Sequence, residues 1–461
     1  MTIAVFLAGL GMAAAGYVLA VRFRWRDLMT MAFLFSVAFF LSRFDQMLTL
    51  SVLGRPLLGI HIYLATVALL LALLRGVRGV TRRRGRGSAT RLLMVWCLLS
   101  LVSGAVHAGA EGLAAAAQIL FIAVPPFVVA AQITDLYPRT PEANRRLRLS
   151  IALLIGLITP LIMLLTALLP DVIGPAMGWR QQAVSADNGF VRGWSPLGST
   201  IASGGLVIMA YGVLLHEYMT TRRPIFAMLA ALNVVAIMFT LARSVLFAFL
   251  ILHVLYWLLW ARRQRLGQML CVPVAIAAAV FGLAVLKGDY SFDRFLETGD
   301  FSLSVRKASA AAALGVSIRE PLLGAGPGLL YEEVRTTWLR SDDSGDKRRL
   351  MMVGDEMTAM EPHNMYLLIA AEHGWPALLV FVAILAVPIM VSLRARASPR
   401  ISGQASLNIA IWVSLCLLML TDSDPLLNAQ FAVFFWLFGF LGVHAAETVP
   451  ARGGPERSRE V

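Results

Sequence analysis

Three side chains in the second half of the sequence have the chemistry needed to transfer a group from a phosphate ester. Arg243 lies between two apolar runs in FTLARSVLFAFL, Arg306 opens a predicted helix in VRKASAAAALGV, and His363 precedes the apolar run NMYLLIAA. Arginine stays charged and binds two phosphate oxygens with its planar guanidinium group. Histidine commonly takes the proton from an attacking hydroxyl. The three residues together suit a lipid-linked diphosphate, with the arginines on the leaving group and the histidine as general base.

The position of His363 in the chain supports this assignment. It follows Pro362, and proline is favoured at the first position of a helix. We therefore predict that His363 lies in the first helical turn, where the helix dipole disfavours the imidazolium form and leaves a neutral base. Each residue also has a structural interpretation: Arg243 as an interfacial arginine, Arg306 as a solvated charge and His363 as a helix cap. Their combination favours catalysis.

The composition shows which elements must position these side chains. Apolar residues make up 58% of the 461 residues and charged residues 15%, whereas soluble domains have roughly 45–50% and about 25%. Unbroken apolar runs such as IALLIGLITPLIMLLTALL at 151–169 predict membrane helices and not the alternating strands of a barrel. The sequence therefore predicts an all-α polytopic membrane protein.

The apolar runs are long enough to give about 13 membrane spans, or 12 if the first two form one hairpin-like element. The candidate spans are 2–21, 28–48, 57–74, 92–108, 113–134, 150–169, 199–218, 225–241, 244–260, 268–286, 374–393, 405–421 and 429–446.

The net charge of +13 comes mainly from arginines between these spans, as in 75–91 and 135–149. The positive-inside rule assigns such loops to the cytoplasm, so no nucleic-acid partner is needed. The long segment 287–363 then lies outside, in the periplasm, and the helix predicted within it favours a functional loop. The predicted regions are N-terminal membrane helices at 1–286, the large periplasmic loop at 287–363, C-terminal membrane helices at 364–446 and a cytoplasmic tail at 447–461.

Other motifs give weaker signals. His216-Glu217 begins like a zinc-protease motif, but Thr220 stands where the second histidine is required. The glycines at 324, 326 and 328 could let backbone amides approach a phosphate, although an ordinary turn is equally consistent with them. The sequence gives no reason to expect a metal site or a cofactor.

Two stretches resemble the O-antigen ligase and polymerase superfamily. They are SLSVRKASAAAALGVSIREPLLGAGPG at 302–328 and PHNMYLLIAAEHGWPALLVF at 362–381. FTLARSVL resembles the family's earlier arginine element, and the resemblance covers about residues 195–390. Departures from the family pattern are Trp375-Pro376 after the Glu-x-Gly triplet, Ala377 where glycine is common, and Ala242 and Ser244 around Arg243.

The resemblance implies a multi-pass glycosyltransferase of the bacterial inner membrane. Such enzymes work without a metal at the periplasmic face and use undecaprenyl-diphosphate-linked glycans. By position, His363 corresponds to the essential histidine, and Arg243 and Arg306 correspond to the arginines that contact the diphosphate. The supporting positions are Gly324, Gly326, Gly328, Asn364 and Glu372.

Two activities within this superfamily fit the sequence. In a polymerase of exopolysaccharide or O-antigen, which we expect, the acceptor is another lipid-linked repeat. In an O-antigen ligase, the alternative, the acceptor is lipid A-core. Membrane lipids and other polysaccharide-assembly proteins are further candidate partners. A lipid-linked glycan transporter is the rival from another class, although acidic residues, which transporters use to bind ions or relay protons, are scarce within the spans. A membrane scaffold without catalytic activity is a third possibility.

Overall fold

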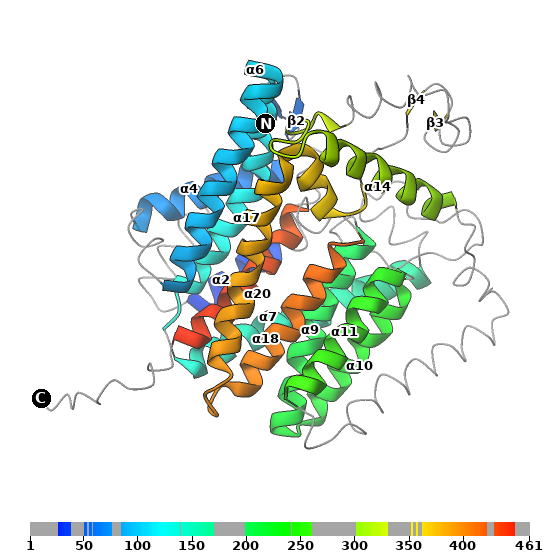
Figure 1. Ribbon diagram of the computed structural model, residues 1–461. Helices are drawn as coiled ribbons and strands as arrows, with labels where there is room; N and C mark the ends of the chain where they lie inside the picture. The colour runs from blue at the N-terminus through cyan, green and yellow to red at the C-terminus, as the bar shows by residue number, and fades with distance from the viewer. Residues whose placement is uncertain are drawn as a thin grey trace, which may run out of the picture.

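The computed structural model is a bundle of α-helices (Figure 1). The residues it describes are 26–37, 50–52, 55–57, 59–75, 84–138, 140–169, 199–240, 242–260, 301–330, 352–353, 356–357, 362–421 and 428–447. The helices are α2 (Arg26–Phe35), α4 (Gly59–Arg75), α6 (Arg84–Asp135), α7 (Pro141–Leu168), α9 (Thr200–Thr221), α10 (Pro224–Phe239), α11 (Arg243–Leu259), α14 (Phe301–Arg319), α17 (Met365–Ala395), α18 (Ser402–Leu418) and α20 (Ala429–Glu447).

The described strands form two small antiparallel hairpins. β1 (Leu50–Val52) pairs with β2 (Arg55–Leu57), with Leu50 opposite Leu57. β3 (Met352–Val353) pairs with β4 (Glu356–Met357), with Met352 opposite Met357. These strands are peripheral to the helices, so the predicted all-α class is confirmed.

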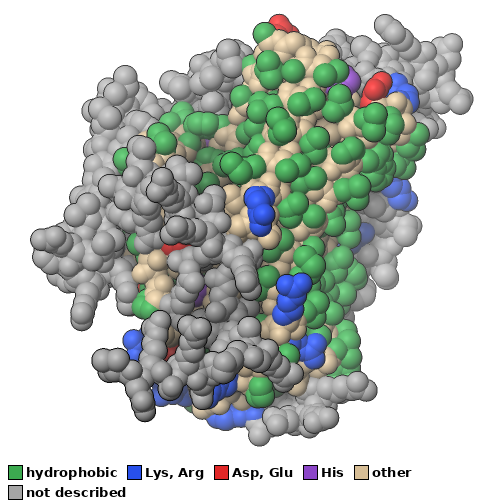
Figure 2. All heavy atoms as spheres, turned by 60° about the vertical axis from the view of Figure 1, so that its left-hand side comes forward, with side chains coloured by type: hydrophobic (Ala, Val, Ile, Leu, Met, Phe, Trp, Pro, Cys, Tyr) green, Lys and Arg blue, Asp and Glu red, His purple; other side chains and the backbone are tan. Residues whose placement is uncertain are grey.

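The helices have the composition of a multi-pass membrane protein. Among the described residues, four helices are long and apolar enough to cross a membrane, namely α6, α7, α9 and α17, and six shorter helices are also apolar. Their outer surfaces carry large apolar side chains, such as Met94, Leu98, Val102 and Val106 at four-residue intervals along α6. Hydrophobic side chains predominate in the described part of the face shown in Figure 2. The predicted spans 2–21 and 268–286 lie outside the described residues.

The long helix α6 reverses direction at Ala108 and Gly109, whose backbone angles are not helical. Gly104 and Gly112 would lie about 12 Å apart in a straight helix, yet their backbones touch and leave no room for a Cβ atom on either residue. α6 is therefore two antiparallel helices joined by a tight turn, as the separate predicted spans 92–108 and 113–134 require.

α17 reverses in the same way at Gly374, which has a φ of 81° and a ψ of 168°. The rings of Tyr366 and Phe381 are 6.1 Å apart between centroids, whereas a straight helix would separate these residues by about 22 Å. A short arm over 365–373 therefore packs back on a long arm over 375–395. The long arm corresponds to the predicted span 374–393.

The bundle has two distinct ends. The turn of α17 meets α14 at one end, which we call the α14 end (Figure 1). At the opposite end, the far end, the last carbonyl of α11 at Leu259 accepts hydrogen bonds from Arg396 Nη2 (3.0 Å), just after α17, and from Ser406 Oγ (3.4 Å) in α18. α18 therefore runs from the far end toward the α14 end, and α11 runs antiparallel to it and ends at the far end. Between α18 and α6, aromatic rings of α20 fill the core; the ring centroids of Phe435 in α20 and Trp412 in α18 are 4.2 Å apart.

Candidate functional site

His363 lies just before α17 and its side chain is exposed. The N-cap of α17 is Asn364, whose side-chain oxygen accepts hydrogen bonds from the backbone N–H groups of Tyr366 (3.0 Å) and Leu367 (3.1 Å). The prediction that His363 occupies the first helical turn is therefore wrong, because the asparagine side chain caps the helix one residue later. This capping is the observed role of Asn364, which was predicted only as a supporting residue.

His363 is the apex of a tight turn. The N–H of Asn364 donates to the carbonyl of Pro362 at 2.6 Å, which closes a three-residue turn around the histidine. Pro362 itself is buried. The imidazole is thus presented outward from a backbone that is fixed on both sides, by the buried proline and by the cap of α17.

His363 precedes the short arm of α17, whose other end, at Gly374, lies at the α14 end. The histidine therefore lies the length of this arm away from the α14 end. From Gly374 the arm runs about 13 Å toward the far end, and its first residue, Met365, donates its N–H to the carbonyl of Met419 at 2.9 Å. The Tyr366 hydroxyl donates to the carbonyl of Cys416 at 2.8 Å. Both acceptors lie at the end of α18, so His363 stands beside that end.

Arg243 approaches the same end of α18. It is the first residue of α11 and its side chain is exposed. From Leu259 back to Arg243 the helix rises about 24 Å, and from Ser406 to Met419 it rises about 20 Å. Because Leu259 and Ser406 are hydrogen-bonded at the far end, Arg243 lies within about one turn of the level of Met419. The fold therefore brings Arg243 and His363 to the same level beside α18.

Arg306 lies on the inward face of α14. Ser309, Ala313 and Ser317, which follow it at helical spacing, are at most 1% exposed, and the side chain of Arg306 is half-buried. Its Nε atom is buried and makes no hydrogen bond. A buried guanidinium N–H without an acceptor is costly, so an anionic ligand is a natural partner for this atom. The alternative of an ordinary solvated charge does not fit this burial.

The glycine-rich turn that follows α14 packs directly on the reversal of α17. The N–H of Ala325 donates to the carbonyl of Ala371 (2.7 Å), and the N–H of Gly326 donates to the carbonyl of Glu372 (3.0 Å). These bonds satisfy carbonyls at the end of the short arm. A Cβ atom on Gly374 would lie 2.5 Å from the backbone carbon of Leu322, so the two backbones meet only where side chains are absent.

These contacts change the interpretation of the glycines. The N–H of Gly324 donates to the carbonyl of Glu320 at 2.9 Å, and that of Gly326 is also engaged within the protein. Neither amide is available to a phosphate, so the structure favours the ordinary turn over the phosphate cradle at these two positions. Gly324, Gly326 and Gly328 all have positive φ values, of 66°, 101° and 69°, which explains why the turn is rich in glycine.

The short arm of α17 ends with two buried residues, Glu372 and His373. The backbone carbonyl of Glu372 accepts a hydrogen bond from Ser103 Oγ (3.1 Å), which also donates to the carbonyl of Leu323 (2.5 Å). Glu372 and His373 line an apolar cavity of about 60 Å³ between α6, α17 and α20, and the ring of His373 lies 5.5 Å from that of Trp96. Sequence reasoning missed Ser103, Trp96 and His373, and a lone serine or tryptophan in an apolar run gave no signal.

Trp375 and Pro376, which depart from the family pattern, lie where α14 and its turn meet α17. The indole Nε1 of Trp375 donates to the carbonyl of Ser317 in α14 at 3.0 Å, and its backbone N–H donates to the carbonyl of Pro321 at 2.9 Å. Pro376 falls in the first turn of the long arm, where a helix does not need its N–H. The tryptophan therefore fastens α14 to α17.

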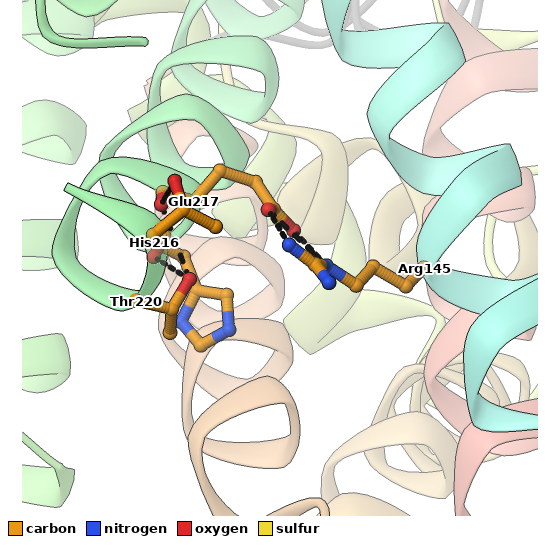
Figure 3. A network of polar contacts seen from close by, with 5 residues as sticks. Arg145, His216, Glu217 and Thr220 are labelled. Atoms are coloured by element: carbon orange, nitrogen blue, oxygen red, sulfur yellow. Dashed lines mark hydrogen bonds and ion pairs between the residues drawn. The ribbon is translucent and has the colours of Figure 1, made fainter. Parts of the chain in front are cut away.

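The His216-Glu217 pair lies at the far end and has protein partners of its own (Figure 3). Arg145 donates to both oxygens of Glu217, through Nε at 2.8 Å and Nη2 at 2.5 Å. His216 Nδ1 shares a hydrogen bond with the Tyr256 hydroxyl at 2.7 Å. Across the described residues, no three histidine, cysteine, aspartate or glutamate side chains gather as they would around a metal ion.

Comparison with known protein families identifies one match. Residues 226–382 match the model of a family described as O-antigen ligase. This range contains Arg243, Arg306, the glycine turn, His363 and Glu372, and it lies within the region where the sequence motifs indicated the resemblance, which is thereby confirmed. The match supports a function of ligase or polymerase type in polysaccharide assembly. No curated protein matches the sequence.

Proposed function

We propose that this protein, which carries an O-antigen ligase region over residues 226–382, is a membrane glycosyltransferase that joins an undecaprenyl-diphosphate-linked glycan to an acceptor hydroxyl. The proposal is supported by the common level of Arg243 and His363 near the end of α18, which follows from the helix rises and from the hydrogen bonds of Leu259 and Met365. A permanent cation and a histidine at one level, beside apolar helices, suit a substrate with a lipid tail and a charged diphosphate.

In the proposed reaction the acceptor oxygen forms a bond to the anomeric carbon of the donor sugar. The bond between that carbon and the diphosphate oxygen breaks, and the lipid diphosphate leaves with the electron pair. His363 accepts the proton of the attacking hydroxyl. Arg243 and Arg306 stabilise the charge on the leaving diphosphate, so this step calls on no metal. Attack opposite the leaving group inverts the anomeric configuration.

The exposure of His363 suits a base that must meet a second substrate. A histidine buried within the fold, like His216, could not reach an acceptor hydroxyl. Arg306 complements it from α14, because its buried Nε lacks an acceptor in the described structure. We propose that the donor diphosphate provides this acceptor.

The polymerase and ligase activities differ only in the acceptor. We favour a polymerase of exopolysaccharide or O-antigen, with a second lipid-linked repeat as acceptor, and keep transfer to lipid A-core as the alternative. In either case the site would face the periplasm from the inner membrane, as the distribution of basic loops predicts.

Reconstitution of the purified protein tests the function. Lipid-linked donor would be incubated in detergent with either a second lipid-linked repeat or lipid A-core. Longer lipid-linked chains identify a polymerase, and glycosylated lipid A-core identifies a ligase. If neither product forms but the donor crosses the membrane of sealed vesicles, the protein is a transporter and the proposal fails.

Cysteine labelling tests the orientation. Lys307 in α14 and Arg91 in α6 are both exposed, so a cysteine at either position can react with a membrane-impermeant reagent. We expect Lys307→Cys to react from the periplasm and Arg91→Cys only after the membrane is opened. Labelling of both from the same side would contradict the periplasmic site.

A further inference from the structure

α14 has an apolar face that its packing on α17 leaves uncovered. Leu314 is 42% exposed and Ile318 is 65% exposed, and Leu322 in the following turn is 72% exposed. These residues follow one another at four-residue spacing, so they form a single row along the helix and turn. We call Leu314, Ile318 and Leu322 the apolar row. Leu314 and Ile318 lie about 80–120° around the helix from Arg306, which is on the inward face.

The apolar row continues onto the outer surface of a membrane-spanning helix. Trp375 joins the two, because its side chain and its backbone are hydrogen-bonded to α14 and its turn at Ser317 and Pro321. From Trp375, which is 38% exposed, the long arm of α17 continues with Leu379 (68%) and Val382 (43%) on the same face. α17 has the length and composition of a membrane span, so this face contacts lipid.

The chemistry of the junction is that of a membrane–water boundary. Tryptophan is enriched at the interface between acyl chains and headgroups, and here it stands between a lipid-facing helix and α14. Arg319 and Lys307 of α14 are exposed, and basic side chains beside an apolar row can reach lipid phosphates. α14 lies across the end of the bundle and not along it (Figure 1).

We infer that the apolar row, with Trp375, rests in the lipid leaflet at the α14 end of the bundle, and that α14 is an interfacial membrane helix. Its partner is the bilayer surface itself. Anchoring one face of α14 in lipid fixes the rotation of the helix, so Arg306, about 80–120° around the helix from Leu314 and Ile318, is held on the inward face. This inference rests on the exposed residues and does not depend on glycosyl transfer.

The test compares two positions of one helix. Ile318 belongs to the apolar row, whereas Glu320 is also exposed but lies about 200° further around the helix. The N–H of Glu320 still bonds to the carbonyl of Val316 at 2.9 Å, so the residue keeps its helical position. Ile318→Cys and Glu320→Cys would be made in a background lacking the three native cysteines and labelled with bimane.

Both labelled proteins would be reconstituted in vesicles of phosphatidylethanolamine and phosphatidylglycerol. We expect nitroxide lipids, spin-labelled near the headgroup, to reduce bimane fluorescence at 318 but not at 320, and aqueous iodide to do the reverse. Leu322→Cys should behave like Ile318→Cys, which guards against an effect of one label.

Two results would overturn the inference. If iodide quenches the labels at 318 and 320 equally, the apolar row faces water. If the label at 318 is protected from both quenchers, another protein or a second copy of the chain covers the row in place of lipid.

Discussion

Two histidines that precede polar residues lie at different levels of the bundle, and their surroundings differ. At the far end, His216 is 6% exposed and Glu217 is 2% exposed, and both have side-chain partners on neighbouring helices. Toward the α14 end, His363 is exposed at the apex of a turn, and its neighbour Asn364 caps α17. The first pair joins helices together, whereas the second presents one side chain outward.

The comparison shows that residue type alone does not identify a site. His216 resembles a catalytic histidine in sequence as much as His363 does, because each precedes a polar residue. The difference between the two histidines lies in their exposure, since His216 is buried and His363 is exposed. Tyr256 bonds to the His216 ring, and Arg145 neutralises Glu217. The inward-facing Arg306, by contrast, keeps a buried Nε without an acceptor in the described structure, which supports the proposal that it binds the donor diphosphate.

Replacing the histidines one at a time should give the largest contrast. We expect His363→Ala to lower turnover by about 10²–10⁴-fold, the contribution of a positioned base. His363→Gln should be nearly as impaired, because it cannot accept the proton. His216→Gln is the control and should leave the turnover of folded protein unchanged. Near-normal turnover in His363→Gln, measured on purified protein, would remove the base role.

Replacing the two arginines of α14, Arg306 and Arg319, should also have different effects on turnover. Arg306→Lys keeps the charge but loses the planar group that binds two oxygens. If one charge-assisted hydrogen bond is lost, turnover should fall by about 10–100-fold. Arg319→Lys, an exposed change on the same helix, is the matched control and should have no effect. Equal turnover in the two variants would make Arg306 a surface charge, and Arg243→Lys tests the second arginine in the same assay.

The reversal of α17 can be tested with a pair of glycines. Gly374→Ala places a Cβ atom against the backbone of Leu322 at a φ of 81°. We expect a loss of about 2–4 kcal/mol in stability, measured by thermal unfolding in detergent, and reduced turnover because His363 shifts. Gly315 in α14 has open space around it, so Gly315→Ala should not destabilise. If Gly374→Ala unfolds at the wild-type temperature, the tight junction described above is wrong.

Breaking the far-end ion pair should have the smallest effect on turnover. The side chain of Glu217 is 3% exposed and that of Arg145 is 47% exposed. Solvent therefore screens the pair in part, and Glu217→Gln should cost about 1–3 kcal/mol in stability. Turnover of the protein that remains folded should stay normal. A large loss of turnover at unchanged stability would place this pair in the mechanism.

Several features follow from local sequence and were predicted correctly. Long unbroken apolar runs indicate membrane-spanning helices, because in lipid such a run satisfies its backbone hydrogen bonds only within a helix. The small and apolar residues at 305–316 indicated a helix, which the structure extends to 301–319. Arg243, placed between two apolar runs, does begin a helix. The motifs around Arg306 and His363 were sufficient to indicate the family.

Only the tertiary structure decides how these pieces meet. Glu372, His373, Gly374 and Pro376 interrupt the apolar run, and the predicted span starts at 374, but they do not reveal that the chain reverses there. The turn exists because the backbone at 322–326 fits against that at 371–375. These contacts also occupy the amide of Gly326, and a local bond to Glu320 occupies that of Gly324. Sequence alone left both amides open to a phosphate. Pro362 predicted an earlier start for α17, but the helix begins after Asn364. The side chain of Asn364 caps it there by accepting hydrogen bonds from two backbone N–H groups. The reversal at Gly374 and the hydrogen bond of the Gly326 amide depend on residues distant in the sequence. The positions of those residues are fixed only by the complete packing of the helices.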